Sequence, residues 1–315
     1  MAGQEKAVES LLTRLYRSPY LLLTAAVFFW AVNSVLGRYM RLDIPPVALA
    51  FWRWAGAALL IAGFAWPHMK RDWPVMRDRR HLPLLLLLAL TGVAMFNTLL
   101  YSGLHSTTAI NAFLIQSLMP VLIILFSFLL FRDRVTGRQA LGVVLSLAGA
   151  VLVIARGDAG VLRSLGLNRG DLLILVAVIG YALYSTLLRR RPQIHPLSFI
   201  GFTFIGGTLM LVPLYLWETL AVKRLVLTLP ALLTIVYVAV FPSVVSYFCY
   251  NRGVELIGAN RAGLFMHLIP VFGTGMALVF LGERFFWFHG LGALMIIGGI
   301  FLTLSRPRRA GRRPG

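Results

Sequence analysis

Polar and aromatic side chains recur at helical spacing inside long apolar stretches of this 315-residue sequence. Trp30, Asn33 and Ser34 fall at positions i, i+3 and i+4, which share one face of a helix. Further stripes with helical spacing are Asn97 with Tyr101; Tyr181, Tyr184 and Ser185; and Ser243, Ser246 and Tyr247. Such a set suits reversible binding of a small solute, because rings pack an apolar body while hydroxyls and amides bind its charged ends.

The same side chains have two other possible roles. Serine and asparagine on membrane helices often only hydrogen-bond a neighbouring helix. Tryptophan and tyrosine near helix ends often anchor a helix at the membrane surface, and Trp30 fits that role as well as it fits a cavity. Because polar groups within apolar helices tend to face the bundle interior, we expect the stripes to converge there.

Arg53 is a basic side chain inside an apolar segment. It lies about seven residues into that segment, which is about 10 Å along a helix. Two interpretations stay open: the side chain extends outward to the membrane surface, or it binds a carboxylate of the solute, which a guanidinium matches with two parallel hydrogen bonds.

His267 and Pro270 lie together in another apolar segment. A histidine has an ordinary pKa of about 6.5, so His267 could carry a proton; as a neutral ring it would hydrogen-bond the solute or a neighbouring helix. All eleven acidic residues fall in termini, loops or segment ends, which excludes a carboxylate relay. Proline removes a helical hydrogen bond and kinks the helix, so Pro270 and its counterpart Pro120 are expected hinges.

The elements that carry these residues must be membrane helices. The chain is 59% hydrophobic and only 13% charged, about half the charge of a soluble domain. Apolar runs of about 20 residues suffice to cross a bilayer, and they are too long for barrel strands. The sequence predicts ten spans, at about 20–38, 47–66, 82–102, 107–131, 137–155, 170–189, 196–217, 228–248, 259–281 and 286–305.

The basic residues predict the orientation of these spans. One set of loops and termini holds 20 Lys and Arg, and the opposite set holds 7, so the first set is expected to face the cytoplasm together with both termini. This distribution accounts for the net charge of +19 without a nucleic-acid partner. We expect a multi-pass protein of the cell inner (plasma) membrane, a monomer or weak homodimer whose partners are the bilayer and a small solute.

The two halves of the chain align at an offset of 150 residues, which places Pro120 over Pro270. Each half holds five spans, and five is odd, so the second half enters the membrane from the opposite side. Inverted repeats are typical of secondary transporters, whose binding site lies between the repeats near the midplane. The expected domains are a cytoplasmic segment 1–18, a first five-helix repeat 19–155, an extracytoplasmic linker 156–169, a second repeat 170–305 and a basic cytoplasmic tail 306–315.

The fourth helix of each half contains proline and ends on an acidic residue and arginine: Asp133 with Arg134, and Glu283 with Arg284. With "LGER" at 281–284 and "FWRWAGAALL" at 51–60, the chain resembles the drug/metabolite transporter superfamily of EamA type, and most nearly its bacterial aromatic amino-acid exporters. We interpret the four helix-end residues as boundary and gating groups. The resemblance implies export of small metabolites, above all aromatic and other neutral amino acids, by alternating access.

Two alternatives remain. The first is a carrier of the same fold for another solute, such as a drug-like compound, a sugar or a nucleotide sugar. The second is an intramembrane enzyme, which the sequence disfavours because it shows no motif for a metal, a nucleotide or a dinucleotide cofactor. We therefore expect no catalytic residues, metal or cofactor. The almost purely apolar, glycine-bearing fifth and tenth helices are expected to pack closely as scaffold.

Overall fold

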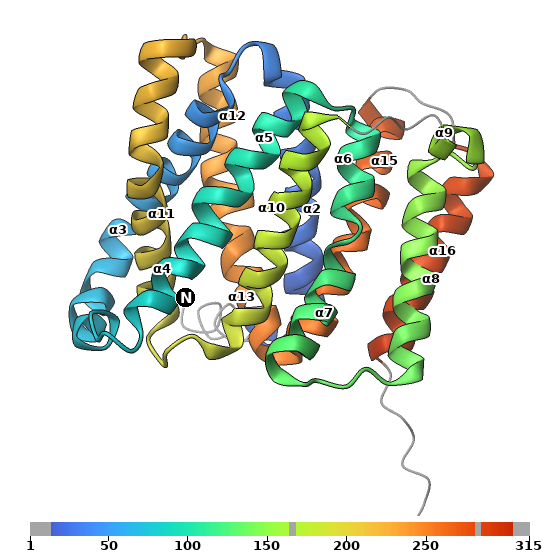
Figure 1. Ribbon diagram of the computed structural model, residues 1–315, viewed down its shortest axis with the longest axis horizontal. Coiled ribbons are helices and arrows are strands. Elements are labelled where there is room, and N and C mark those ends of the chain that lie inside the picture. The colour runs from blue at the N-terminus through green and yellow to red at the C-terminus, as the bar shows by residue number, and fades with distance from the viewer. Residues whose placement is uncertain (1–13, 164–167, 281–284, 305–315) are drawn as a thin grey trace, which may run out of the picture.

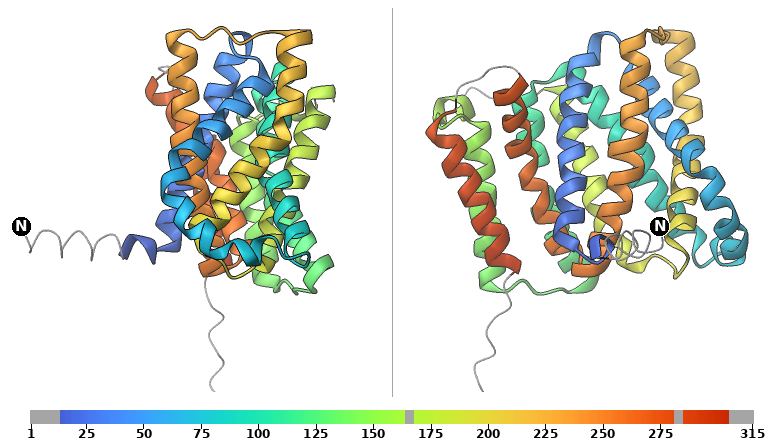
Figure 2. Two further views of the ribbon diagram at one scale, coloured as in Figure 1. Left: turned by 90° about the vertical axis from the view of Figure 1, so that its left-hand side faces the viewer. Right: turned by 180° about the vertical axis from the view of Figure 1, so that it is seen from behind.

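The computed structural model describes residues 14–163, 168–280 and 285–304. Every regular element in these residues is a helix, and the helices stand side by side in one bundle (Figures 1 and 2). Nine of the described helices are long and apolar enough to cross a membrane, and a broken rod over residues 259–280 occupies the tenth predicted position. The predicted all-helical fold of ten segments in two halves is confirmed.

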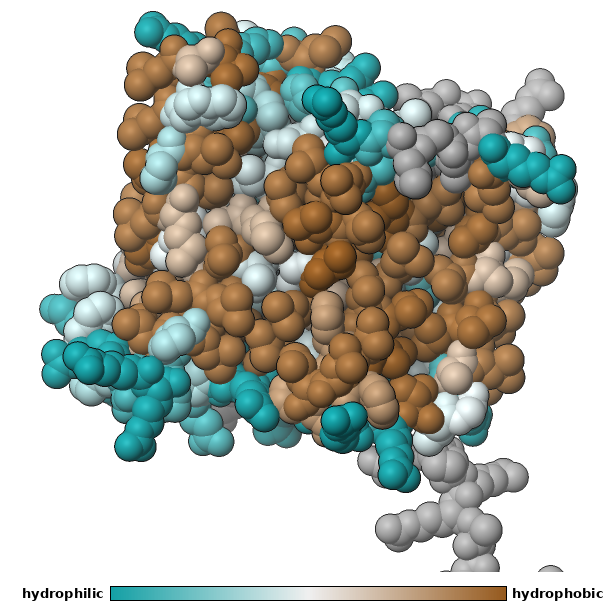
Figure 3. Space-filling model, in the orientation of Figure 1, coloured by the Kyte–Doolittle hydropathy of each residue, from teal (hydrophilic) through white to brown (hydrophobic). Residues whose placement is uncertain are grey.

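The surface agrees with a membrane location. In Figure 3, apolar residues cover the middle of the visible face, while hydrophilic residues gather toward the two ends of the bundle. We call the end at which α2 begins and α16 ends the terminal end, which is the lower end in Figure 1, and the opposite end the far end.

From Pro19 to Arg163, the described part of the first half contains eight α-helices, one 3₁₀ turn and one π-helical segment. They are α2 (Pro19–Tyr39), η1 (Met40–Leu42, 3₁₀), α3 (Pro46–Met76), α4 (Leu82–Ala89), η2 (Leu90–Met95, π), α5 (Phe96–Ser106), α6 (Ala109–Gln116), α7 (Met119–Phe131), α8 (Gly137–Ile154) and the short α9 (Ala159–Arg163).

The second half repeats this order. Its elements are α10 (Arg169–Leu187), η3 (Leu188–Arg190, 3₁₀), α11 (Pro196–Trp217), η4 (Glu218–Val222, π), α12 (Leu229–Ala239), η5 (Val240–Val245, π), α13 (Ser246–Ile257), α14 (Ala259–Gly263), η6 (Leu264–His267, 3₁₀), α15 (Leu268–Phe280) and α16 (Trp287–Leu304).

Two helices extend well beyond the predicted spans. α3 continues to Met76, although its span was expected to end at 66, and α13 continues to Ile257, although its span was expected to end at 248. The extra turns carry polar residues such as Lys70 and Arg252. Apolar runs mark the part of a helix that the bilayer surrounds, whereas backbone hydrogen bonds continue as long as the residues permit a helix.

Helices of the two halves pack closely in pairs, and only α3–α11 and α8–α16 are pairs of counterparts in the repeat. α2 lies along α13, α3 along α11, α5 along α10, and α8 along α16. The α8–α16 pair stands at one side of the bundle (Figure 1). Because the partners come from different halves, the two repeats interlock instead of forming two separate domains.

Reciprocal caps join α3 and α11. Glu218, at the far end of α11, accepts hydrogen bonds from the backbone N–H groups of Val47 (3.0 Å) and Ala48 (2.7 Å) in the first turn of α3. Asp72, near the other end of α3, accepts from the His195 N–H (2.7 Å) and the Ser198 hydroxyl (2.8 Å) where α11 begins. Each helix therefore supplies the carboxylate that satisfies the free N–H groups of its partner.

Candidate functional site

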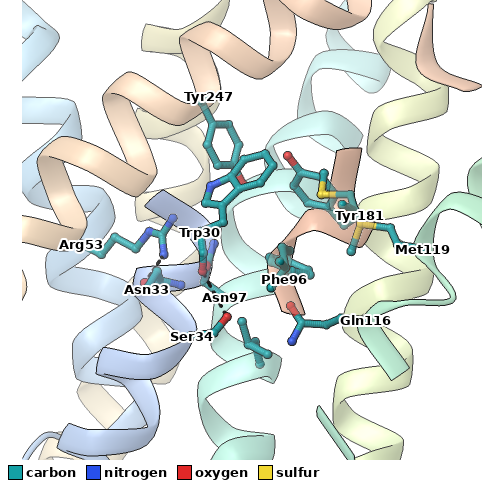
Figure 4. Close-up of a pocket in the computed structure, with 13 residues that line it drawn as sticks. Trp30, Asn33, Ser34, Arg53, Phe96, Asn97, Gln116, Met119, Tyr181 and Tyr247 are labelled. Atoms are coloured by element: carbon teal, nitrogen blue, oxygen red, sulfur yellow. Dashed lines mark hydrogen bonds between the residues drawn. The ribbon is translucent and has the colours of Figure 1, made fainter. Parts of the chain in front are cut away.

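A cavity lies at the centre of the bundle between the two halves (Figure 4). Nine lining residues come from the first half: Trp30, Asn33, Ser34, Arg53, Phe96, Asn97, Leu100, Gln116 and Met119. Four come from the second half: Tyr181, Tyr247, Met266 and Ile269. The cation and the amides thus all come from the first half, whereas both halves supply rings and apolar chains.

Arg53 is the only charged side chain among these lining residues, and it is 1% exposed. Its Nη1 donates to Asn33 Oδ1 (3.0 Å) and to the Tyr101 hydroxyl (2.9 Å). Its Nε donates to Ser243 Oγ (2.7 Å), and its Nη2 donates to the Pro242 carbonyl (2.9 Å). The side chain points inward, which excludes the outward extension to the membrane surface, and it forms no ion pair with any described residue.

Two π-helical segments at equivalent positions shape the walls of the cavity. η2 precedes Asn97 by one residue, and η5 precedes Tyr247 by one residue. A π-helical turn holds an extra residue, which shifts the faces of the helix and rearranges its backbone hydrogen bonds. In η5 the Pro242 carbonyl accepts from Arg53 and also from Trp30 Nε1 (2.8 Å). The π-helical segment therefore presents a backbone acceptor to the site.

The rings beside the cavity form one connected aromatic cluster. The ring centre of Trp30 lies 5.6 Å from that of Tyr181 and 5.9 Å from that of Tyr247. Phe96 lies 4.8 Å from Tyr181 on the other side. These edge-on and tilted contacts leave ring faces and edges that can pack an apolar or aromatic solute.

Two buried polar atoms of the lining residues make no hydrogen bond of normal geometry with a described residue, although both residues lie close to Tyr247. They are Asn97 Nδ2 and the Tyr181 hydroxyl. A buried polar group of this kind is costly, and an unsatisfied one calls for an explanation such as a ligand. Tyr181 and Gln116 offer the cavity hydrogen-bonding groups on the side away from Arg53, whereas Asn97 lies near Asn33 and Ser34 (Figure 4).

The cavity is too narrow for a metabolite in this conformation, which we call closed. Its free volume is about 20 Å³, which suits one water molecule and not a metabolite. A larger vestibule of about 780 Å³ lies at the terminal end, and Arg71, Arg191, His195 and Asn251 help to line it. Partial burial, with the charges of His68 and Arg71, lowers the pKa of His195 there.

The two broken helices meet beside the cavity. The first is interrupted between Gln116 and Met119, just before Pro120, and the second has a 3₁₀ turn just before Pro270. His267 is fully buried: its Nε2 lies 2.9 Å from the Ser117 carbonyl, and its Nδ1 lies 2.8 Å from Ser146 Oγ. Because a carbonyl only accepts, Nε2 must carry a hydrogen.

The structure brings many of the predicted contact residues together. Those that line the cavity are Trp30, Asn33, Ser34, Arg53, Asn97, Tyr181 and Tyr247. Those that lie behind the lining, bonded to other groups of the protein, are Tyr101, Tyr184, Ser185, Ser243, Ser246 and His267. Trp30 lies at the centre and not at the membrane surface.

Sequence reasoning missed six lining residues: Phe96, Leu100, Gln116, Met119, Met266 and Ile269. Five of them are apolar and look like ordinary membrane residues. The internal repeat could have found four, because at the offset of 150 Gln116 corresponds to Met266 and Met119 to Ile269. These two pairs flank the breaks in the helices.

Asp133 and Arg134, the two predicted helix-end residues that the structure describes, lie away from the cavity. Asp133 forms an ion pair with Arg189 (2.5 Å) at the terminal end, and Arg134 is exposed there. Glu283 and Arg284 lie outside the described residues. The structure therefore gives no contact between this motif and the central site in the part of the chain that it describes.

Known proteins resemble this chain along most of its length. The model of the EamA-like transporter family matches residues 17–155 and again residues 168–305. The uncharacterized transporter YyaM of Bacillus subtilis (strain 168) is 29% identical over 91% of this chain and 93% of its own. The uncharacterized inner membrane transporter YicL of Salmonella typhimurium is 24% identical over 92% and 96%. A solved crystal structure of a protein superimposes with a TM-score of 0.73 at 19% identity, over 91% of this chain and 96% of that chain, which shows the fold alone.

Proposed function

The chain belongs to the EamA-like transporter family of membrane proteins, and on that premise we propose that it exports small zwitterionic metabolites, aromatic and other neutral amino acids above all. The proposed route is alternating access around the central cavity. We further propose that the terminal end faces the cytoplasm, since its loops and termini hold 20 Lys and Arg against 7 at the far end.

This proposal rests on the burial and the hydrogen-bond partners of Arg53. It is a buried cation with four neutral acceptors and no carboxylate partner among the described residues. Burying a charge is expensive unless an opposite charge or many hydrogen bonds compensate it. The carboxylate of an amino acid would supply the missing negative charge at the cavity wall.

The rest of the cavity suits the remainder of an amino acid. The rings of Trp30, Phe96 and Tyr181 can pack an aromatic or aliphatic side chain. The amides of Asn97 and Gln116 provide acceptor oxygens for the ammonium group. A cationic solute would find no carboxylate among the lining residues to bind it. A nucleotide sugar would find only one guanidinium there for its two phosphates.

We propose transport without an obligatory proton. Of the described acidic residues near the membrane interior, Glu218 and Asp72 cap helices, and Asp171 accepts hydrogen bonds from Thr107 and from Asn111 (3.0 Å). His267 is bonded on both ring nitrogens and does not line the cavity. A group held in this way has no open path to a solute in this conformation.

Uptake into proteoliposomes tests the substrate class. Labelled phenylalanine, tryptophan and leucine should enter, and unlabelled phenylalanine should compete far better than phenethylamine, which lacks the carboxylate. Arg53→Met should abolish uptake. The matched control is Arg41→Met, because Arg41 also bonds a neutral carbonyl, that of Arg38, but lies outside the cavity. Equal competition by phenethylamine, or uptake by Arg53→Met equal to that of Arg41→Met, would contradict the proposal.

A further inference from the structure

Two pairs of helices face each other across the cavity. The first pair is α2 with α13, and the second is α5 with α10; within each pair the helices pack along one another. Between the pairs, long side chains form the bridges. The two bridges described next connect the same two helix pairs, but they do so on opposite sides of the cavity.

The terminal-end bridge joins α10 to α13. The Tyr184 hydroxyl donates to Asn251 Oδ1 (2.8 Å), and both residues are buried. Tyr184 lies three residues, about 5 Å, from the terminal end of α10. Asn251 lines the vestibule, while the ring of Tyr184 contacts Tyr181 and Tyr247 of the cavity wall. This bond therefore separates the vestibule from the cavity.

The far-end bridge joins α2 to α5. The Tyr101 hydroxyl donates to Asn33 Oδ1 (2.5 Å), and both residues are buried. Asn33 lies six residues, about 9 Å, from the far end of α2, and Tyr101 lies five residues from the far end of α5. One turn beyond, Arg38 of α2 donates to the carbonyls of Leu104 and Thr107. The bond therefore stands between the cavity and the far end.

The two bonds are counterparts in the internal repeat. Asn33 corresponds to Tyr184 and Tyr101 to Asn251, so the same tyrosine–asparagine hydrogen bond occurs in each half with its two residues exchanged. Because the two halves are repeats, each contains the tyrosine–asparagine pair. Because the repeats are inverted, one pair lies toward each end of the cavity.

We propose that these two tyrosine–asparagine bonds are the gates of the transporter. Tilting the α2–α13 pair against the α5–α10 pair lengthens the bond at one end and retains the bond at the other, so the cavity opens to one side at a time. In the closed conformation described here, both bonds are formed.

The two gates differ in strength because Arg53 joins only one of them. Its Nη1 donates to both Asn33 and Tyr101, whereas the terminal bond is between neutral groups alone. Hydrogen bonds with a charged partner are about twice as strong as neutral ones. The terminal gate therefore opens more readily, and a solute carboxylate that draws Arg53 away weakens the far gate once the site is filled.

Labelling of a single cysteine tests the gates. Phe96→Cys, in a Cys249→Ser background, places a thiol on the cavity wall between the two bonds. Phe96 lies five residues on the terminal side of Tyr101. Its ring contacts Tyr181, which lies about one turn on the far side of Tyr184. A membrane-impermeant maleimide is added to spheroplasts and to inverted vesicles, which expose opposite faces. Tyr184→Phe should speed labelling from the terminal face about fivefold, the effect of one neutral hydrogen bond on an equilibrium. Tyr101→Phe should speed labelling from the far face instead.

The matched control is Tyr215→Phe, which removes a tyrosine hydroxyl that accepts from Trp52 outside both gates; it should leave both rates unchanged. If a phenylalanine variant does not fold, Asn251→Ser and Asn33→Ser remove the acceptors of the same two bonds and give the same readout. Faster labelling from one face in both variants, or from neither, overturns the proposal. The assay uses no solute, so its result is independent of the amino-acid proposal, and it rests only on the chain being a transporter.

Discussion

Two seams between helices in this protein are built in opposite ways. In the glycine seam, Gly142 and Gly149 of α8 face Gly299 and Gly292 of α16, and the backbones touch. In the polar seam, between the α2–α13 and α5–α10 pairs, the tyrosine–asparagine bonds and Arg53 bridge the helices with side chains. Each seam joins residues of both halves that are related by the internal repeat, so duplication alone decides neither its rigidity nor its chemistry.

The difference teaches where this fold can move. A Cβ atom added at Gly149 would lie 2.7 Å from the carbonyl oxygen of Gly292, and one added at Gly292 would lie 2.8 Å from that of Gly149. Backbone contacts of this kind leave no side chain free to rearrange, and the predicted close packing of the two scaffold helices is confirmed. In the polar seam, by contrast, a change of a few hydrogen bonds can let the helices separate.

The largest expected effect breaks the glycine seam. Gly299→Leu would force a side chain against the Gly142 carbonyl and within 2.8 Å of the Ser146 nitrogen. Because the backbone atoms of α8 cannot move aside as a flexible side chain can, we expect most of the folded protein to be lost in detergent. The control is its neighbour Gly298→Leu, whose Cβ would meet only Leu145, at 3.8 Å. Size-exclusion profiles of the two variants decide; equal monodisperse yields would show that the seam is not rigid.

The second prediction changes the polar seam without harming the fold. Asn33→Asp puts a carboxylate where the amide oxygen now lies 3.0 Å from Arg53 Nη1. This internal carboxylate would occupy the guanidinium in place of the solute, and phenylalanine uptake should fall about tenfold to hundredfold. Asn33→Ala, which places no carboxylate beside Arg53, should reduce phenylalanine uptake less. The prediction fails if the aspartate variant transports as well as the alanine variant.

The third prediction is that the α3–α11 interface is rigid, like the glycine seam, and contributes to stability and not to transport. Glu218→Ala and Asp72→Ala each remove a reciprocal cap, which should lower the free energy of unfolding by about 1–2 kcal/mol. Transport per folded molecule should stay close to that of the unaltered protein. Thermal denaturation is the measurement, with Asp78→Ala, which removes an acceptor within an exposed turn, as the control. Unchanged melting midpoints in both cap variants would contradict this prediction.

The smallest expected effect concerns His267. His267→Gln keeps a neutral hydrogen-bonding side chain toward Ser117 or Ser146, so uptake should stay within about threefold of the unaltered protein. Uptake should also proceed without a pH gradient, and an imposed gradient should not concentrate the solute. If a gradient does drive accumulation and His267→Gln abolishes it, His267 is a proton carrier.

Local information in the sequence determined the helices, their number and the inverted repeat. Apolar runs of about 20 residues can be nothing but membrane helices, because lipid offers no partner for free backbone groups. The stripes through Trp30, Asn97, Tyr181 and Tyr247 were also visible, since helical spacing depends only on near neighbours. Seven of the predicted contact residues line the cavity for that reason.

Only the tertiary structure decided which groups meet. Arg53 bonds Pro242 and Ser243, and Glu218 bonds Val47 and Ala48, across more than half of the chain. No spacing in the sequence encodes such contacts, because they depend on how the two halves interlock. The π-helical segments before Asn97 and Tyr247 shift the helix faces in a way that a regular 3.6-residue period does not predict. A stripe thus tells which residues share a face, but packing selects whether that face meets a solute or another helix.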